Sequence, residues 1–529
     1  FRYTGRSADL DGSVRAGELA LVALPRGHPD RPVALVGLAL ARHARYGRHG
    51  APADLAGAVR AARDAVAATP VGDPELAGRL STLCDVLLTR ADTGATAVAD
   101  LDEAVALGAR AAAATGPRAA LYLSNYAGAL LARAERVGNQ DDLAAAIHIG
   151  GRAVDACPVG AAHRAACLAN LGRAVHARFE HLGSPADRER AVALSREAAS
   201  DPAGAPEVRV RAAARWGSWS ADARDWPAAT AGYAAAVELL GRVAPRELPR
   251  GDQDFELARL AGLAGDGAAC ALHAGDPGRA VELLERGRGI VLSHALRGHG
   301  PADADADPDL PDLPDLDELG AAGPVVVVNV SPRRCDALVL TGSGVTVVAL
   351  PELTPATVRA AAADFLTALH VRDRADATAA DLDGVEDTVT GVLGMLWDTV
   401  AGPVLDRLDI AGLPRVWWCP TGLLALLPLH AAGRPGDGVL ERTVSSVTPT
   451  LRALAHARRP LAAGGSGLLV VAPPGGPQLP AARREVRRLV ETFPGAVTTL
   501  TGPAATRDAV LAALPSRPRL HLAGHAAAD

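Results

Sequence analysis

The chain has 529 residues, of which 49% are hydrophobic, 22% charged and only 3% aromatic, and its formal net charge is −6. This length and composition predict a globular protein of more than one domain. The chain contains no lysine, which excludes sites that need a lysine amine, such as a P-loop or a Schiff base. No basic stripe is present, so nucleic acid is not an expected partner.

The cysteines form no CxxC pair and no disulfide framework, which favours a reducing, cytoplasmic location. No continuous apolar run approaches 18 residues, so no membrane partner is expected. The chain starts at Phe1 and its only methionine is Met395, so we expect a fragment of a longer protein. The cysteines lie at positions 84, 157, 167, 270, 335 and 419.

Two short sequence motifs repeat through the first half of the chain. One motif begins with Asp. The other motif ends in Arg, and its copies start at Leu80, Leu123 and Leu168. In the last copy Leu168, Leu171, Val175 and Leu182 fall on one helical face. Asp suits a helix N-cap, and the Gly about five residues after each Arg suits a helix C-terminus. The positions are Asp 54, 100, 142, 187, 225 and 276, Arg 90, 133 and 178, and Gly 94, 138 and 183.

Two helices in each period of about 40 residues predict an α-solenoid. The pattern resembles degenerate tetratricopeptide repeats over residues 30–297, and we place a helical repeat domain at 1–298. The resemblance implies a surface that binds a regulatory protein partner. A purely structural scaffold is the alternative, and the sequence does not separate the two.

An acidic, proline-rich segment, "PADADADPDLPDLPDLDELG" (Pro301–Gly320), follows the repeats. Repeated Pro and adjacent carboxylates disfavour a helix or a core strand, so we expect a semi-extended linker at 299–322. A calcium loop is a second interpretation, but the segment lacks the Gly turn and the final Glu of such loops.

From Gly323 onward apolar runs of strand length alternate with helical stretches, which predicts a mostly parallel α/β sheet covered on both faces. The turn Thr341–Gly344 predicts a hairpin, "RVWWCP" (Arg415–Pro420) a buried strand, and "GLLVVAPP" (Gly467–Pro474) another. A helix is expected at Ala481–Phe493, a strand in "AVTTLTG" (496–502) and a further helix at Ala505–Leu514. A last strand is expected in "PRLHLAGHA".

Several sequence motifs occur together in the second half of the chain: "PTGLLALLPLHAA" (420–432), "SSVTPTLRAL" (445–454), "LPAARREV" (479–486), "GPAATRDAVLAAL" (502–514) and "LHLAGHA". In this order they resemble the CHAT domain, a caspase-like cysteine peptidase family whose domain follows tetratricopeptide repeats. The resemblance covers residues 323–529. It implies a caspase-like α/β fold, no cofactor and no metal, and a protein or peptide substrate.

His521 and His525 lie four residues apart near the end of the chain. On a helix they would be about 6 Å apart and suited to a shared metal. Alternating leucines and Gly524 favour a strand, on which the separation is about 13 Å. His521 is then interpreted as a core histidine. By the family resemblance His525 is the general acid–base, and the backbone N–H of Ala526, where the family has Gly, helps to form the oxyanion hole.

Neither Cys335 nor Cys419 fits the family's cysteine motif, and in caspase-type sequences the cysteine follows the histidine by roughly 50 residues. We therefore expect the nucleophile beyond Asp529 and an inactive fragment. The predicted function is a cysteine endopeptidase module regulated by the helical repeats. A non-catalytic scaffold or adaptor with a degenerate peptidase-like domain is the alternative.

Overall fold

The computed structural model describes residues 7–94, 96–245, 247–297, 313–374, 376–408, 412–458, 467–472, 480–517 and 519–523. Its internal contacts define two compact units, Phe1–Leu454 and Ala455–Asp529. The first unit holds the helical repeats and a five-stranded sheet. The second holds a three-stranded sheet.

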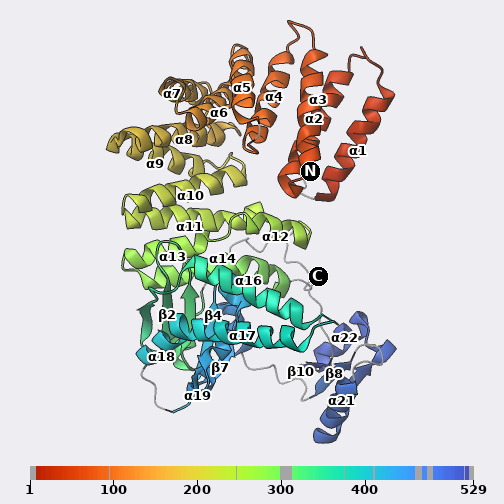
Figure 1. The fold of residues 1–529 in the computed structure, drawn as a ribbon, viewed down its shortest axis with the longest axis vertical. Helices are drawn as coiled ribbons and strands as arrows, with labels where there is room; N and C mark the ends of the chain where they lie inside the picture. The colour runs from red at the N-terminus through yellow and green to blue at the C-terminus, as the bar shows by residue number, and fades with distance from the viewer. Residues whose placement is uncertain are drawn as a thin grey trace. The chain divides into compact units, whose positions relative to one another are not determined.

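The first unit begins with helices α1 to α14, most of which pair with the next helix along the chain (Figure 1). The predicted succession of two helices per repeat is confirmed. The helices are α1 (Ser7–Ala23), α2 (Arg31–His49), α3 (Pro52–Ala67), α4 (Leu76–Ala91), α5 (Ala97–Ala112), α6 (Ala119–Val137), α7 (Gln140–Asp155), α8 (Arg164–Leu182), α9 (Pro185–Ser200), α10 (Pro206–Asp222), α11 (Trp226–Val243), α12 (Arg250–Ala258), α13 (Leu263–His273) and α14 (Pro277–Arg297).

Apolar faces of neighbouring helices bury one another along the repeats. Leu168, Leu171 and Val175 are at most 3% exposed, as their spacing predicts. Leu182 differs, with 67% of its surface exposed, because it is the last residue of α8 before Gly183 ends the helix. Gly138 and Gly183 are the expected left-handed C-caps, whereas Gly94 lies in the loop beyond α4.

The repeated Asp residues serve two purposes. Asp225 caps α11 as predicted, and Asp276 accepts a hydrogen bond from the N–H of Arg279 in the first turn of α14. The four earlier ones are not N-caps. Each lies inside the first turn of its helix and forms a two-pronged ion pair with an Arg on the preceding helix: Arg45–Asp54, Arg90–Asp100, Arg133–Asp142 and Arg178–Asp187.

In the pair Arg133–Asp142 both N–H···O distances are 2.7 Å. The hydrogen bonds from Arg178 lower the pKa of the Asp187 carboxyl below its ordinary value. Two-pronged pairs of this kind fix the angle between two helices as well as stabilising them. The repeated Arg and Asp residues therefore form the ion pair that holds the two helices of each repeat together.

Helix α12, late in the repeat domain, contacts the first two helices of the chain. Asp252 of α12, which is 4% exposed, accepts hydrogen bonds from Arg48 of α2 at 2.7 Å and from the N–H of Ser7 at 3.1 Å. The guanidinium of Arg48 also lies 3.8 Å from the centre of the Phe255 ring. Helix α12 thus connects a late part of the array to its first two helices.

The sheet of the first unit has the order β3-β2-β1-β4-β7. The predicted hairpin is confirmed, since β2 and β3 are antiparallel with Thr341 opposite Gly344. Strand β1 is antiparallel to β2 and parallel to β4, so this sheet is mixed. The strands are β1 (Val325–Asn329), β2 (Asp336–Thr341), β3 (Gly344–Ala349), β4 (Arg415–Pro420) and β7 (Val444–Val447).

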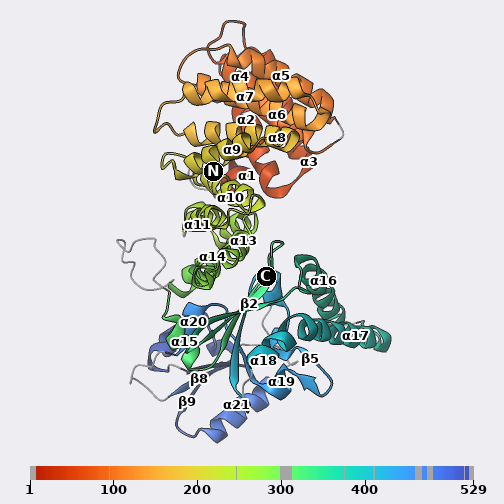
Figure 2. The same ribbon diagram turned by 90° about the vertical axis from the view of Figure 1, so that its left-hand side faces the viewer.

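Helices cover both faces of this sheet. Val326, Val339 and Trp418 point to one face and pack with α16 (Pro355–Arg372), α17 (Ala379–Leu396) and α18 (Gly402–Leu408), which lie on one side of the sheet in Figure 2. The alternate residues Val325, Leu338 and Cys419 are also fully buried. On their side lie the last repeat helices, α13 and α14, and the short helix α15 (Leu316–Ala321).

Helix α15 corrects one expectation. The linker was predicted to be semi-extended, yet its end forms a helix capped by Asp315, whose carboxylate accepts the N–H groups of Asp317 and Glu318. The helix begins after Pro314, the last proline of the segment, so nothing in the backbone prevents it. Residues 298–312 lie outside the described part of the chain.

One helical run, Ala379–Leu408, has the length and composition of a membrane span. It comprises α17, a π-helical turn at Trp397–Ala401 and α18. Val392, Leu396 and Val404 of this run are buried in the core of the first unit. A core helix meets the same criteria of length and composition as a membrane span.

The second unit is a parallel sheet in the order β10-β8-β9. It consists of β8 (Leu468–Ala472), β9 (Val497–Thr501) and β10 (Arg519–Leu522), with helices α21 (Pro480–Thr492) and α22 (Arg507–Ala513). Each of these elements falls where the sequence predicts it. A separate sheet for these strands was not expected.

Candidate functional site

The predicted catalytic residues His525 and Ala526 lie outside the described residues. The strand that leads to them is described, and it runs parallel to β8 as far as Leu522. The N–H of Ala523 still donates to the carbonyl of Val471 at 2.9 Å. The described residues therefore reach the carboxyl edge of β8 and β10, the edge at which α/β folds bind ligands.

His521 lies within β10 and is only partly buried. Its Nε2 is 3.0 Å from Oε1 of Glu485 on α21, and 35% of its side chain is exposed. The interpretation of His521 as a core histidine is therefore wrong, because the ring is partly exposed beside a carboxylate and its neighbour Leu522 is 64% exposed. In the described part of the chain no three His, Cys, Asp or Glu side chains are grouped as a metal site would require.

All six cysteines are buried and free. Burial raises the pKa of Cys419 to about 11, and Arg288 offsets part of that rise; burial also raises the pKa of Cys335. The Cys335 thiol packs in the core of the sheet and donates to the carbonyl of Ser331 at 3.4 Å. A nucleophilic cysteine needs a lowered pKa and access to substrate. Neither thiol has these properties.

The last repeat helix is joined to the sheet by buried polar contacts. Nη1 of Arg288 on α14 lies 2.8 Å from Sγ of Cys419 and 3.3 Å from its carbonyl oxygen, both on β4. One turn earlier, Glu285 is 2% exposed and accepts the N–H groups of Leu451 and Arg452, each at 2.9 Å. These two residues open helix α20 (Leu451–Ala457), so the carboxylate replaces the helical partners that they lack.

A second set of contacts joins α10 and α13 to the loop between β1 and β2. Ser331 donates to the partly buried carboxylate of Asp266 on α13 at 2.7 Å. Arg333 donates to Asp222 at 3.0 Å and to Ser218 Oγ at 3.1 Å, both on α10. Burial raises the pKa of Asp266, while the hydrogen bond from Ser331 opposes the rise. The repeats and the sheet are therefore one packed body, not two bodies on a free tether.

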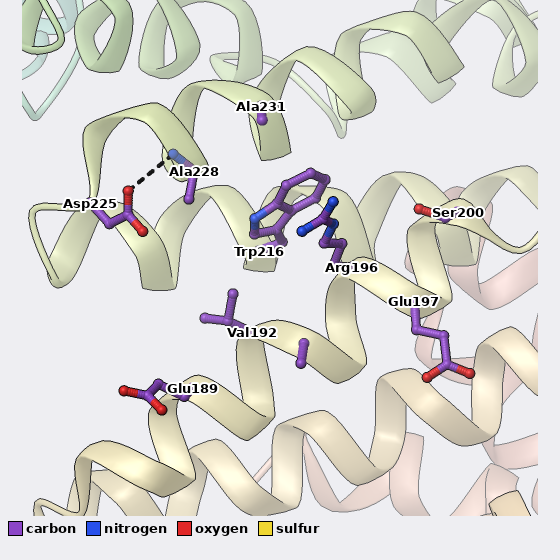
Figure 3. A pocket seen from close by; sticks show the side chains of 10 residues that line it. Glu189, Val192, Arg196, Glu197, Ser200, Trp216, Asp225, Ala228 and Ala231 are labelled. Atoms are coloured by element: carbon purple, nitrogen blue, oxygen red, sulfur yellow. Dashed lines mark hydrogen bonds between the residues drawn. The ribbon is translucent and has the colours of Figure 1, made fainter.

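A cleft of about 630 Å³ lies between α9 and α11 (Figure 3). Trp216 of α10 forms its floor, and the guanidinium of Arg196 lies 5.4 Å from the centre of that ring. Glu197 on its rim is paired with Arg164, and Asp225 caps α11. No Cys or His lines the cleft, whose lining combines apolar side chains with one guanidinium, Arg196, and three carboxylates.

Residues 390–529 match the model of the CHAT domain family. We refer to these matched residues below as the CHAT domain of this chain. The match begins inside α17 and includes β4, β7 and the whole second unit. Strands β1 to β3 precede the matched residues, yet β1 pairs with β4 of the CHAT domain over four residues. Through β4 and α20, the polar contacts of α14 fall directly on the CHAT domain.

Solved structures that are similar to this chain are helical proteins with low sequence identity. BtubC from P. vanneervenii is 17% identical, with 49% of this chain and 96% of that chain covered and a TM-score of 0.31. The S. pombe nuclear import adaptor Nro1 is 13% identical, with 52% and 96% covered and a TM-score of 0.32. A Podosopora anserina putative kinesin light chain with TPR-like repeats is 18% identical, with 43% and 100% covered and a TM-score of 0.25. No protein of curated function matches the sequence.

The interface between the repeats and the CHAT domain was not found from the sequence. Glu285 and Arg288 lie in the amphipathic helical stretch 280–298, where charges are expected on the solvent side. The available signal was their spacing of three residues, which places both on one helical face. The apolar sequence of β4 gives no sign that the thiol and the carbonyl of Cys419 contact the guanidinium of Arg288.

Proposed function

We propose that this chain belongs to a caspase-like cysteine endopeptidase whose activity is controlled by a protein that binds the helical repeats. The CHAT match supports the peptidase class, and the single observation that carries the proposal for control is the buried contact of α14 with β4 and α20. In this proposal His525 is the general acid–base, which protonates the leaving amine, and the N–H of Ala526 donates to the oxyanion.

The nucleophile in this proposal lies outside residues 1–529. The cysteines at positions 84, 167, 270, 335 and 419 have pKa values raised by burial, and all six thiols are covered by protein. A thiol in such surroundings is a small apolar side chain rather than an attacking group. A cysteine supplied by further sequence would complete the pair with His525.

Control follows from the way the last repeat packs. A partner that changes the curvature of the array would move α14, and α14 holds the start of α20 through Glu285 and the end of β4 through Arg288. A partner shifts the balance between two arrangements only by as much as it binds one of them more tightly. For such regulation, the contacts of α14 with the CHAT domain must differ between the partner-bound and the partner-free states.

The test is a pair of histidine variants in the protein extended to include the nucleophile. His525→Ala should reduce peptide cleavage by about 10²–10⁴-fold, which is the usual contribution of a general acid–base. His521→Ala, on the same strand but paired with Glu485, should keep cleavage within about twofold. Product release by mass spectrometry measures both. Full activity of His525→Ala would contradict the proposal, and an inactive parent protein would favour the scaffold alternative.

A further inference from the structure

Arg215 on α10 is a partly buried cation without a counter-charge among the described residues. Among the described residues no acidic side chain pairs with it, and the charges that act on it are those of two other arginines, Arg173 and Arg211. Burial, followed by these like charges, lowers the pKa of Arg215 to about 10. The guanidinium is therefore charged at neutral pH and is held near two more positive charges.

A ring stack shows how the two helices that carry these arginines face each other. His176 of α8 and Trp219 of α10 stack with ring centroids 4.1 Å apart and an interplanar angle of 9°. Arg173 lies one turn before His176, and Arg215 lies one turn before Trp219. Each helix is antiparallel to the next, so α8 and α10 run in the same direction. By helical spacing Arg173 and Arg215 therefore lie one turn before the stack on their two helices, with Arg211 a further turn along α10. Both Arg173 and Arg211 are close enough to Arg215 for their charges to act on it.

The nearest carboxylates are used elsewhere or are distant. Asp222, on the same face of α10, is bound by Arg333 at 3.0 Å. Glu180 lies 3.7 Å from Nδ1 of His176. Glu135 forms a long, exposed ion pair with Arg173, at 3.9 Å, and Arg211 donates to the backbone carbonyl of Glu207.

We propose that Arg173, Arg211 and Arg215 form a binding site for the carboxylates of an acidic peptide, with the His176–Trp219 stack as its apolar wall. Guanidinium groups bind carboxylates in a two-pronged geometry, and a bound anion removes the repulsion within the cluster. This inference names the partner's chemistry for the proposed function, but the site stands whether or not the chain supports cleavage.

A peptide fits this site better than nucleic acid does. The three arginines occupy two helices of one region, and the chain has a net charge of −6 and no lysine. Nucleic acid requires many phosphate contacts spread along a basic surface. One or two adjacent carboxylates would satisfy the cluster.

The test measures binding to the chain of residues 1–529 and needs no peptidase activity. The probe is a fluorescein-labelled peptide with four consecutive aspartates, and its control carries asparagines in their place. Fluorescence anisotropy should show binding of the aspartate peptide that weakens with salt. Arg215→Gln should weaken binding by about tenfold or more, which is the loss expected for a charged hydrogen-bond pair. Arg190→Gln, an equal charge change at an exposed site on α9, should leave the affinity within about twofold.

The thermal midpoint distinguishes loss of the site from loss of the fold. Without peptide, Arg215→Gln should raise Tm by about 1–3 °C because it removes a partly buried, unbalanced charge. Equal binding by Arg215→Gln and the parent, equal binding of the asparagine peptide, or no binding of either peptide would overturn the proposal. Displacement of the aspartate peptide by inorganic phosphate below 1 mM would also overturn it in favour of a phosphate site. None of these outcomes bears on His525.

Discussion

Replacement of Glu285 by alanine should lower the free energy of unfolding of the first unit by about 3–4 kcal/mol. The carboxylate is 2% exposed and accepts the N–H groups of Leu451 and Arg452 at 2.9 Å each. Its removal leaves these groups without their acceptor in the interior and takes a negative charge away from the start of α20. Glu285→Gln keeps the shape and one acceptor oxygen, so a smaller loss, about 1–2 kcal/mol, is expected.

Glu282→Ala is the matched control for this prediction. Glu282 lies on the same helix, and its partners Arg279 and Arg286 are more exposed, with 30% and 36% of their side chains accessible. Its loss should cost less than about 1 kcal/mol. Urea unfolding followed by circular dichroism measures all three variants. A loss for Glu285→Ala no larger than that for Glu282→Ala would show that the contact between α14 and α20 contributes nothing.

Gly232→Ala should be at least as damaging, because the new methyl group has no space. Its carbon would lie 2.4 Å from the backbone nitrogen and 2.7 Å from the Cα of Gly217. Since both atoms belong to the backbone of α10, no side chain can move aside, and α10 and α11 must separate. We expect a loss of about 3 kcal/mol or more, at the upper end of overpacking effects.

Gly241 supplies the opposite expectation on the same helix. No heavy atom lies within 4 Å of the position of its added methyl group. Gly241→Ala should therefore stabilise the helix by roughly 0.5–1 kcal/mol through propensity alone. Differential scanning calorimetry should show Tm shifts of opposite sign for the two variants. Shifts of the same sign would mean that the close approach of α10 and α11 is not tight in solution.

The sequence predicted the helical repeats, the hairpin and every strand of the second unit, because apolar periodicity and turn residues report burial locally. It placed the repeated Asp residues as N-caps, which holds for Asp225 but not for Asp142. Both positions favour a carboxylate near the helix start. Only the arrangement of two helices shows that Asp142 turns back to Arg133. The separation of nine residues between them was the available signal.

Contacts between segments far apart in the chain could not be predicted. Arg333 binds α10 more than a hundred residues away, and Asp252 binds Arg48 two hundred residues away. No local pattern marks such partners, since each is a single charged residue in a loop or at a helix end. The catalytic role of His525 stays a prediction, because the described residues end at Ala523.

The central claim is that a cysteine outside residues 1–529 acts with His525 in a peptidase. Covalent labelling of the active, extended protein with a peptidyl chloromethyl ketone tests it most directly, with the labelled thiol located by mass spectrometry. We predict one labelled cysteine beyond residue 529, while the six buried cysteines react only after denaturation. Labelling of Cys335 or Cys419 in the native protein, together with loss of cleavage, would contradict this account.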